Sequence, residues 1–182
     1  MRDELDSLLC KTYPKMFVER HKPMQETCMC WGFECGDGWF NIIDQLCSNI
    51  QHYIDWTERN YKRDVEYNTA VTEAKNGNTA GLEEYFKDMY RIDDRIAEAI
   101  DGPLREVKEP PTQVVVNQVK EKFGTLRFYY TGGDDQIRGM VSMAESMSGV
   151  TCEECGAPGT TGGRGWISTL CDVHRKKYEK QL

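Results

Sequence analysis

The sequence has no long hydrophobic run, and its apolar stretches fall far short of the ~20 residues that a membrane-spanning helix needs. It also lacks an excess of positive charge, since 23 Lys and Arg stand against 30 Asp and Glu, for a net charge of −7. A protein that grips a phosphate backbone without regard to sequence needs a basic face. The composition therefore argues against a membrane partner and makes nucleic acid a weaker expectation, with a local basic patch still open.

The chain is also poor in the residues and motifs of catalysis. Only three histidines occur, and the sequence contains no nucleophile elbow, H-E-x-x-H motif, kinase motif set or P-loop. Carboxylates are plentiful, but their spacing singles out no pair. We therefore expect a non-enzymatic protein and assign no catalytic residue; an enzyme with a new kind of site is the alternative.

The N-terminal segment lacks the features of a targeting sequence. Its first residues include Arg2, Asp3, Glu4 and Asp6, which is typical of neither a signal peptide nor a transit peptide. We therefore expect a cytoplasmic protein, in a compartment that keeps thiols reduced. Eight cysteines in that setting favour metal ligands or small buried side chains over disulfides.

Four potential ligands form a specific pattern near the end of the sequence: Cys152, Cys155, Cys171 and His174. A C-x2-C pair and a C-x2-H pair are separated by fifteen residues. Two pairs of soft ligands at such a spacing build a tetrahedral zinc site, and the segment between them can form a short hairpin. Four protein ligands close the coordination shell, which indicates one structural zinc ion in a C-terminal zinc ribbon rather than a catalytic metal.

Hydrophobic periodicity predicts an α+β fold, with a helical N-terminal half and one antiparallel β-hairpin packed by helices ahead of the zinc ribbon. The expected elements are a short helix within 5–17 interrupted at Pro14, a long helix from 39 to about 60, a helix over 82–100 stopped by Gly102-Pro103, strands at 113–121 and 125–131, and a helix from an Asp134 N-cap to Ser148. Residues 61–79 are polar and end in Asn76-Gly77-Asn78, which indicates a loop. The predicted domains are 1–149, with an acidic helical insertion at about 61–111, and a zinc-ribbon module at 150–182.

A second cysteine cluster, Cys28, Cys30 and Cys35, lies in a loop that contains several glycines. Its C-x-C-x4-C spacing is not a common zinc pattern, so a second metal and a set of small buried thiols both remain open. Trp31 and Trp39 belong to the same region. Each could be a stacking platform for a ligand, although Trp39 also fits a core position just before the long helix.

The predicted hairpin carries a candidate ligand site. Lys120 and Lys122 share one strand face because side chains alternate along a strand, and Arg127 joins them if the turn is tight. Tyr129 lies on the same face as Arg127. Three cations and an aromatic ring can hold a phosphate and stack a base; the alternative is an exposed sheet edge protected by lysines. Further candidate rings for such a ligand are Trp31, Trp39 and Trp166.

Four segments together resemble a family of small phage and prophage proteins that carry a C-terminal zinc ribbon. They are the loop CMCWGFECGDGWF at 28–40, the hairpin VKEKFGTLRFYY at 119–130, the helical AESMS at 144–148, and CEECGAPG, GWISTLC and the final histidine within 151–174. The resemblance covers about the first 55 residues and everything after about residue 112, so the acidic middle lies outside it. It implies a phage-type origin and a zinc ribbon, and it implies no reaction.

The leading hypothesis is a non-enzymatic, phage-type zinc-binding protein that binds a host component in the host bacterial cytoplasm. One form of it is counter-defence, in which the hairpin face sequesters a nucleotide-like immune signalling molecule. A second hypothesis is a protein–protein adaptor or inhibitor that docks a host bacterial protein through the acidic helical region. A third is a nucleic-acid-binding zinc ribbon, which the net charge of −7 disfavours.

Overall fold

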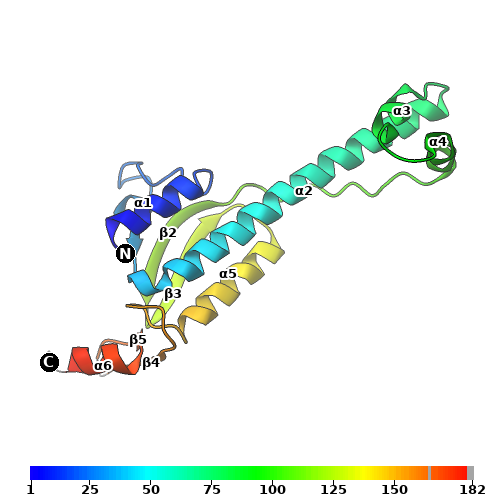
Figure 1. Cartoon of the computed structure of the whole chain (residues 1–182). Coiled ribbons are helices and arrows are strands. Elements are labelled where there is room, and N and C mark those ends of the chain that lie inside the picture. The colour runs from blue at the N-terminus through cyan, green and yellow to red at the C-terminus, as the bar shows by residue number, and fades with distance from the viewer. Residues whose placement is uncertain (164, 180–182) are drawn as a thin grey trace. The chain divides into compact units, whose positions relative to one another are not determined.

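The structure is a computed structural model that describes residues 1–163 and 165–179 and divides into two compact units (Figure 1). Unit 1 comprises Met1–Tyr53 and the chain from Pro111 onward, and unit 2 comprises Ile54–Pro110. The first boundary falls within α2 (Phe40–Lys75), so this helix contributes to both units. None of the helices in the described ranges is long and apolar enough to cross a membrane.

Unit 1 combines helices, a small sheet and a second hairpin, which confirms the α+β fold. Its helices are α1 (Asp3–Thr12), the 3-10 turns η1 (Met29–Trp31) and η2 (Asp37–Trp39), the first part of α2, α5 (Asp135–Ser148) and α6 (Asp172–Glu179). Its strands are β1 (Phe33–Glu34), β2 (Val115–Lys122), β3 (Thr125–Thr131), β4 (Thr160–Gly162) and β5 (Ser168–Leu170). The first helix ends ahead of Pro14, where the sequence predicts an interruption.

The predicted hairpin is present as β2 and β3, which pair antiparallel. Its turn consists of Phe123 and Gly124, whose φ angles of 56° and 80° are both positive, as a two-residue type I′ turn requires. The sheet has a third strand that the sequence analysis missed. Strand β1 pairs parallel with β2, with Phe33 opposite Val119 and Glu34 opposite Lys120. Two residues are too few to produce a periodic hydrophobic signal.

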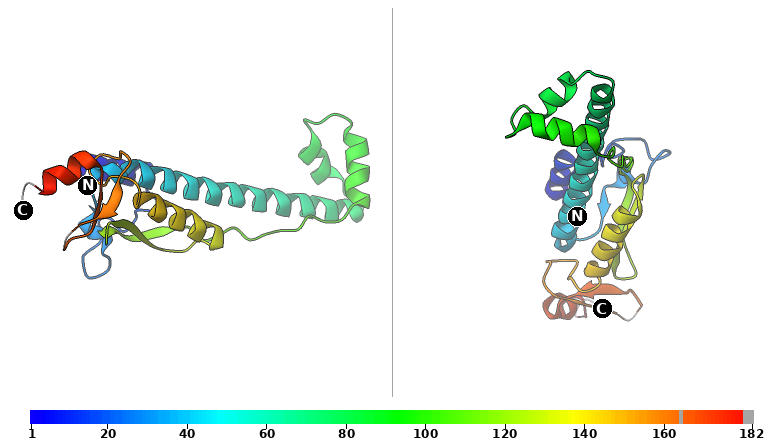
Figure 2. Two further views of the ribbon diagram at one scale, coloured as in Figure 1. Left: turned by 90° about the horizontal axis from the view of Figure 1, so that it is seen from below. Right: turned by 90° about the vertical axis from the view of Figure 1, so that its right-hand side faces the viewer.

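One face of this sheet is buried. The β2–β3 register shifts between Val116 and Gln118, and this bulge allows Val116 and Val119, three residues apart, to be buried together. Leu126 and Phe128 of β3 are buried as well. The first part of α2 and α5 lie over this side of the hairpin (Figures 1 and 2). The predicted packing of the hairpin by helices is therefore confirmed.

Helix α5 covers the edge of β3. Two strand N–H groups that point away from β2 are bonded by side chains of α5: Leu126 N–H donates to Ser148 Oγ at 2.8 Å, and Phe128 N–H donates to Glu145 Oε1 at 2.9 Å. An edge strand with unpaired amides is open to pairing with another chain, and these bonds close it. The predicted N-cap is also confirmed, because the Asp134 carboxylate accepts from Ile137 N–H at 3.0 Å.

Unit 2 corrects the predicted end of the long helix. The sequence predicts an end near residue 60, but α2 continues to Lys75, because 61–76 contain neither Gly nor Pro. The residues Tyr67, Ala70, Val71 and Ala74 recur at helical spacing and pack in the core of unit 2. Most side chains of this segment are polar because they lie on its exposed side. The apolar side chains on its buried side stabilise it as a helix by packing in the core of unit 2.

The predicted single helix over 82–100 is also wrong, since two helices are present. These are α3 (Ala80–Phe86) and α4 (Ile92–Asp101), and the residue before α4, Arg91, has a left-handed φ of 60°. The break lets Leu82 and Phe86 of α3 and Ile96 of α4 pack into one cluster with α2. The predicted stop is confirmed, because α4 is capped by Gly102.

Candidate metal centre and basic sheet face

The second hairpin brings the four predicted metal ligands together. Cys152 and Cys155 lie in the turn that follows α5, Cys171 follows β5, and His174 is in the first turn of α6. One ligand atom from each of the four residues lies within 4.8 Å of all the others. In the described part of the chain this is the only group of three or more His, Cys, Asp or Glu side chains that could hold a metal ion.

The distances fit a single tetrahedral ion. With metal–sulfur bonds of about 2.3 Å and metal–nitrogen bonds of about 2.0 Å, two sulfur ligands lie about 3.8 Å apart and a sulfur and a nitrogen about 3.5 Å apart. The Cys155 and Cys171 Sγ atoms are 3.9 Å apart. His174 Nδ1 lies 3.5 Å from Cys152 Sγ and 3.3 Å from Cys171 Sγ. The cluster could therefore bind one metal ion through a closed shell of four protein ligands.

The backbone around the ligands supports this geometry. Cys152 C=O accepts from Gly156 N–H at 2.8 Å, which closes the turn that carries the first ligand pair. Gly156 has a φ of 77°, a conformation that glycine adopts without a steric penalty. A hydrogen bond from the backbone N–H of His174 lowers the pKa of the Cys171 thiol to about 7. The thiolate is the form of cysteine that binds metal.

A loop from the N-terminal part of unit 1 holds the first ligand pair in place. Gly38 N–H donates to Glu153 C=O at 2.7 Å, and Gly36 N–H donates to the Glu153 carboxylate at 2.9 Å. A Cβ on Gly38 would lie 2.2 Å from Cys152 O, 2.4 Å from Gly156 N and 2.6 Å from Cys155 N. The glycine is therefore required for the close approach of two backbones. This contact is one that sequence reasoning missed, and the pair of glycines in CGDGW was its only signal.

Trp39 belongs to the same contact, and the structure corrects its predicted ligand role. The side chain is fully buried, and its Nε1–H donates to Thr151 C=O at 2.8 Å. A buried ring with its one donor in use cannot stack on a ligand, so the prediction of Trp39 as a stacking platform is wrong. Its role is to anchor the chain just before the metal ligands.

The loop cysteines are not gathered into a second centre. Cys28 is exposed, Cys30 is partly buried and Cys35 is buried, and the three do not form a ligand group among the described residues. Burial raises the pKa of the Cys35 thiol to about 12. At neutral pH this thiol is protonated and a poor metal ligand. Of the two alternatives for these cysteines, the geometry favours small packed thiols.

The hairpin register places the predicted cationic residues on one face. Lys120 is opposite Arg127, Lys122 is opposite Thr125, and Tyr129 follows two residues after Arg127. The Lys120 Nζ atom lies 5.5 Å from the centre of the Tyr129 ring. Because the core-facing residues of these strands are on the other side, these four side chains form a basic sheet face (Lys120, Lys122, Arg127 and Tyr129).

The three cations of the basic sheet face have no acidic partner in an ion pair among the described residues. Arg127 Nη1 donates to Thr125 Oγ1 at 2.6 Å and to Leu126 C=O at 2.7 Å. Glu34 of β1 is opposite Lys120, but its carboxylate accepts from Gln118 Nε2 at 3.0 Å and is in no ion pair with that lysine. Like charges directly opposite each other on two strands are unfavourable, and a bound anion would relieve that repulsion.

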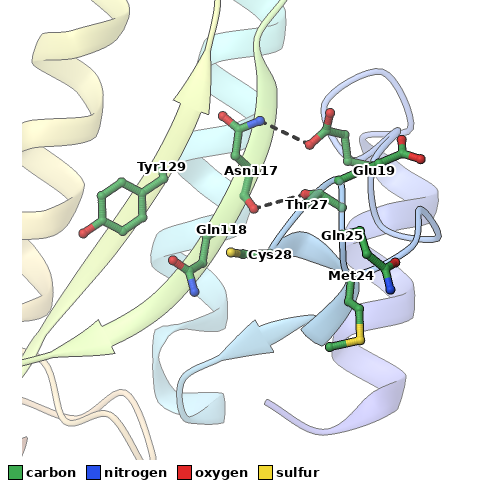
Figure 3. Close-up of a pocket in the computed structure, with 9 residues that line it drawn as sticks. Glu19, Met24, Gln25, Thr27, Cys28, Asn117, Gln118 and Tyr129 are labelled. Carbon is green, nitrogen blue, oxygen red and sulfur yellow. Dashed lines mark hydrogen bonds between the residues drawn. The ribbon is translucent and has the colours of Figure 1, made fainter.

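A hollow of about 430 Å³ lies beside Tyr129 (Figure 3). It is lined by Glu19, Met24, Gln25, Glu26, Thr27, Cys28, Asn117, Gln118 and Tyr129. Figure 3 shows these residues on β2, β3 and the loop that precedes η1. Its two carboxylates make the hollow unsuitable for phosphate, so an anionic group belongs on the neighbouring cations. The other two predicted rings, Trp31 and Trp166, are exposed and do not line it.

No protein-family model, curated protein or solved structure matches the chain.

Proposed function

We propose that the protein is a non-enzymatic zinc-binding protein whose basic sheet face captures a nucleotide-like ligand. The observation that carries this proposal is the cross-strand pair Lys120 and Arg127, without an ion-pair partner among the described residues and beside the exposed ring of Tyr129. A phosphate can be held by such cations, and a base can stack on such a ring. The ligand class follows from this combination of charge and aromatic surface.

Zinc is the metal that suits the centre best. Three thiolates and one imidazole are soft and borderline ligands, and a tetrahedral set of sulfur and nitrogen atoms is typical of structural zinc. Four protein ligands leave no open position for a substrate or a reactive water. We therefore assign the ion the role of a brace in a zinc ribbon built around the hairpin of β4 and β5.

The resemblance to phage proteins supplies the setting of the proposal. In the cytoplasm of an infected bacterium, a protein that binds a nucleotide-like immune signal without turning it over would act by sequestration. This form of counter-defence needs affinity and abundance, and it needs no catalytic group. The absence of catalytic motifs in the sequence is compatible with it.

The double variant Lys120→Ala/Arg127→Ala is expected to bind nucleotides about 100-fold more weakly, since each lost charge-assisted contact contributes about 1.4 kcal/mol. Isothermal titration of the zinc-loaded protein with GTP, ATP and a cyclic dinucleotide measures this change. The matched control is Arg59→Ala/Lys62→Ala, which removes two cations from an exposed stretch of α2 in unit 2. Equal affinities of both double variants and the wild type would refute the proposed site.

The adaptor hypothesis concerns unit 2, and a deletion of this unit distinguishes it from nucleotide capture by the basic sheet face. In unit 1 the side-chain amides of Gln51 and Gln113 are hydrogen-bonded at 3.0 Å, so the chain leaves and re-enters unit 1 at neighbouring points. Replacing residues 54–110 by a short glycine–serine linker should therefore leave unit 1 folded and its nucleotide affinity unchanged, as titration would show. If this variant still captures a host protein, docking through the acidic region is contradicted. If the variant is folded but no longer binds nucleotides, the basic sheet face is not the nucleotide site.

A further inference from the structure

The turn of the first hairpin carries an unexpected residue. Phe123 occupies its first position with a φ of 56°, where Asn, Asp or Gly is strongly preferred. A bulky residue with positive φ is a true outlier, and strained backbone of this kind concentrates at functional sites. The side chain does not repay the strain by burial, since 67% of Phe123 is exposed. Its ring is therefore presented to solvent at an energetic cost.

The ring of Phe123 continues the basic sheet face. Lys122 Nζ lies 5.6 Å from the centre of this ring, just as Lys120 Nζ lies 5.5 Å from that of Tyr129. Cations and exposed rings thus alternate along the hairpin from Tyr129 to the turn. From Thr125, the first residue of β3 after the turn, to Tyr129 the strand advances four residues, or about 13 Å.

The second hairpin adds another ring at the same end. Thr169 Oγ1 donates to Gly124 C=O at 2.5 Å, and a Cβ on Gly124 would lie 3.2 Å from Ile167 Cγ2. The turn of the first hairpin is therefore seated on the loop that carries Trp166, whose side chain is 77% exposed. Strand β5 connects this loop to Cys171, one of the candidate metal ligands. The zinc ribbon therefore helps to position Trp166 near the turn of the first hairpin.

We propose that the ligand of the basic sheet face is a single-stranded oligonucleotide, with bases stacked on Tyr129, Phe123 and Trp166 and phosphates on the three cations. A mononucleotide has one base and cannot stack on several separate rings at once, whereas single-strand-binding folds commonly engage about 4–16 nucleotides through rings and cations. The proposal rests on the proposed function, because it uses the same cations.

The distribution of charge permits this ligand. Unit 2 carries 14 Asp and Glu against 9 Lys and Arg, and so accounts for five of the seven net negative charges. Unit 1 is close to neutral as a consequence. The basic sheet face can therefore attract phosphates locally although the whole chain is acidic.

The test measures fluorescence anisotropy of labelled ten-residue oligo(dT) and oligo(U), and competition by GTP and ATP, on the full-length zinc-loaded protein. We expect an oligonucleotide to bind at least about 10-fold more tightly than a mononucleotide, because additional bases stack. Its affinity should fall with salt with a logarithmic slope of about −2, the value for three phosphates on a single strand. The two oligonucleotides distinguish DNA from RNA as the source of the strand.

The double variant Phe123→Asn/Trp166→Ala isolates the inference. Asn is compatible with the turn, so the fold is kept. Each lost ring should weaken oligonucleotide binding about 10-fold, and the loss should be larger than for a mononucleotide, whose single base can still stack on Tyr129. Tyr90→Asn/Trp56→Ala, which alters two exposed rings of unit 2, is the matched control and should change nothing. Equal binding of mononucleotides and oligonucleotides, or no effect of the ring variant, would overturn the inference and leave the proposed function standing. Absence of binding by all nucleotides would overturn both.

Discussion

Replacing Cys171 by Ser is expected to abolish stoichiometric zinc binding and to unfold the second hairpin. The residue contributes a ligand 3.9 Å from Cys155 Sγ and 3.3 Å from His174 Nδ1, and a serine hydroxyl does not replace a thiolate at this ion. The described segment after Thr151 has few fully buried apolar side chains of its own. In small zinc modules the binding free energy, about 10–16 kcal/mol, is the folding free energy.

Native mass spectrometry and a thermal melt check this prediction together. The wild-type protein should carry one zinc ion, the Cys171→Ser variant none, and a chelator should lower the melting temperature of the wild type toward that of the variant. Cys28→Ser is the matched control, because this exposed thiol lies outside the ligand group and its loss should change neither the number of bound zinc ions nor the melting temperature. A Cys171→Ser protein that keeps one tightly bound zinc would show that the four residues are not its ligands.

Replacing Gly38 by Ala is expected to destabilise unit 1 by about 3 kcal/mol, at the upper end of the usual cost of overpacking. The added methyl would meet backbone atoms of Cys152, Cys155 and Gly156 at 2.2–2.6 Å, and backbone cannot rotate away as a side chain can. The φ of Gly38 lies outside the left-handed region, so the effect is steric contact rather than backbone conformation. The turn that carries the first ligand pair should be displaced, and zinc affinity should fall with stability.

Gly139→Ala provides the opposite result as a control. Gly139 is an exposed position inside α5, and a Cβ there meets nothing within 4 Å. Alanine in a helix interior is more favourable than glycine by about 0.5–1 kcal/mol, so this variant should be slightly stabilised. Urea denaturation of both variants measures the two changes. If Gly38→Ala is as stable as the wild type, the close approach of its loop to the metal ligands is wrong.

The Cys171→Ser variant tests a feature that the sequence predicted, and the Gly38→Ala variant tests one that it did not. The four candidate metal ligands could be named from the sequence because the two members of each pair are only three residues apart, which is a local pattern. A single turn is enough to direct both members of a pair toward one ion. Gly38 could not be assigned, because its constraint comes from a chain segment more than a hundred residues away. A glycine in a loop has many local explanations, and only the neighbour that it touches distinguishes them.

The same division holds for the basic sheet face. Side-chain alternation along a strand places Lys120 with Lys122, and the sequence placed Arg127 with them on the condition of a tight turn, which the structure has. The sequence did not show that Phe123 is exposed in a strained turn seated on the loop of Trp166. That arrangement depends on how the two hairpins pack against each other. The alternation of side chains along the strands of either hairpin carries no information about this packing.

The sequence by itself determined the four candidate metal ligands, the first hairpin, the cap of α5 and the stop after α4. Each of these depends on residues within one turn or one pair of neighbouring strands. Only the tertiary structure decided that Trp39 is an anchor, that two residues at 33 and 34 form a strand, and that α2 reaches Lys75. These features are stabilised by contacts with residues distant in the sequence, and burial against such partners outweighs local propensity.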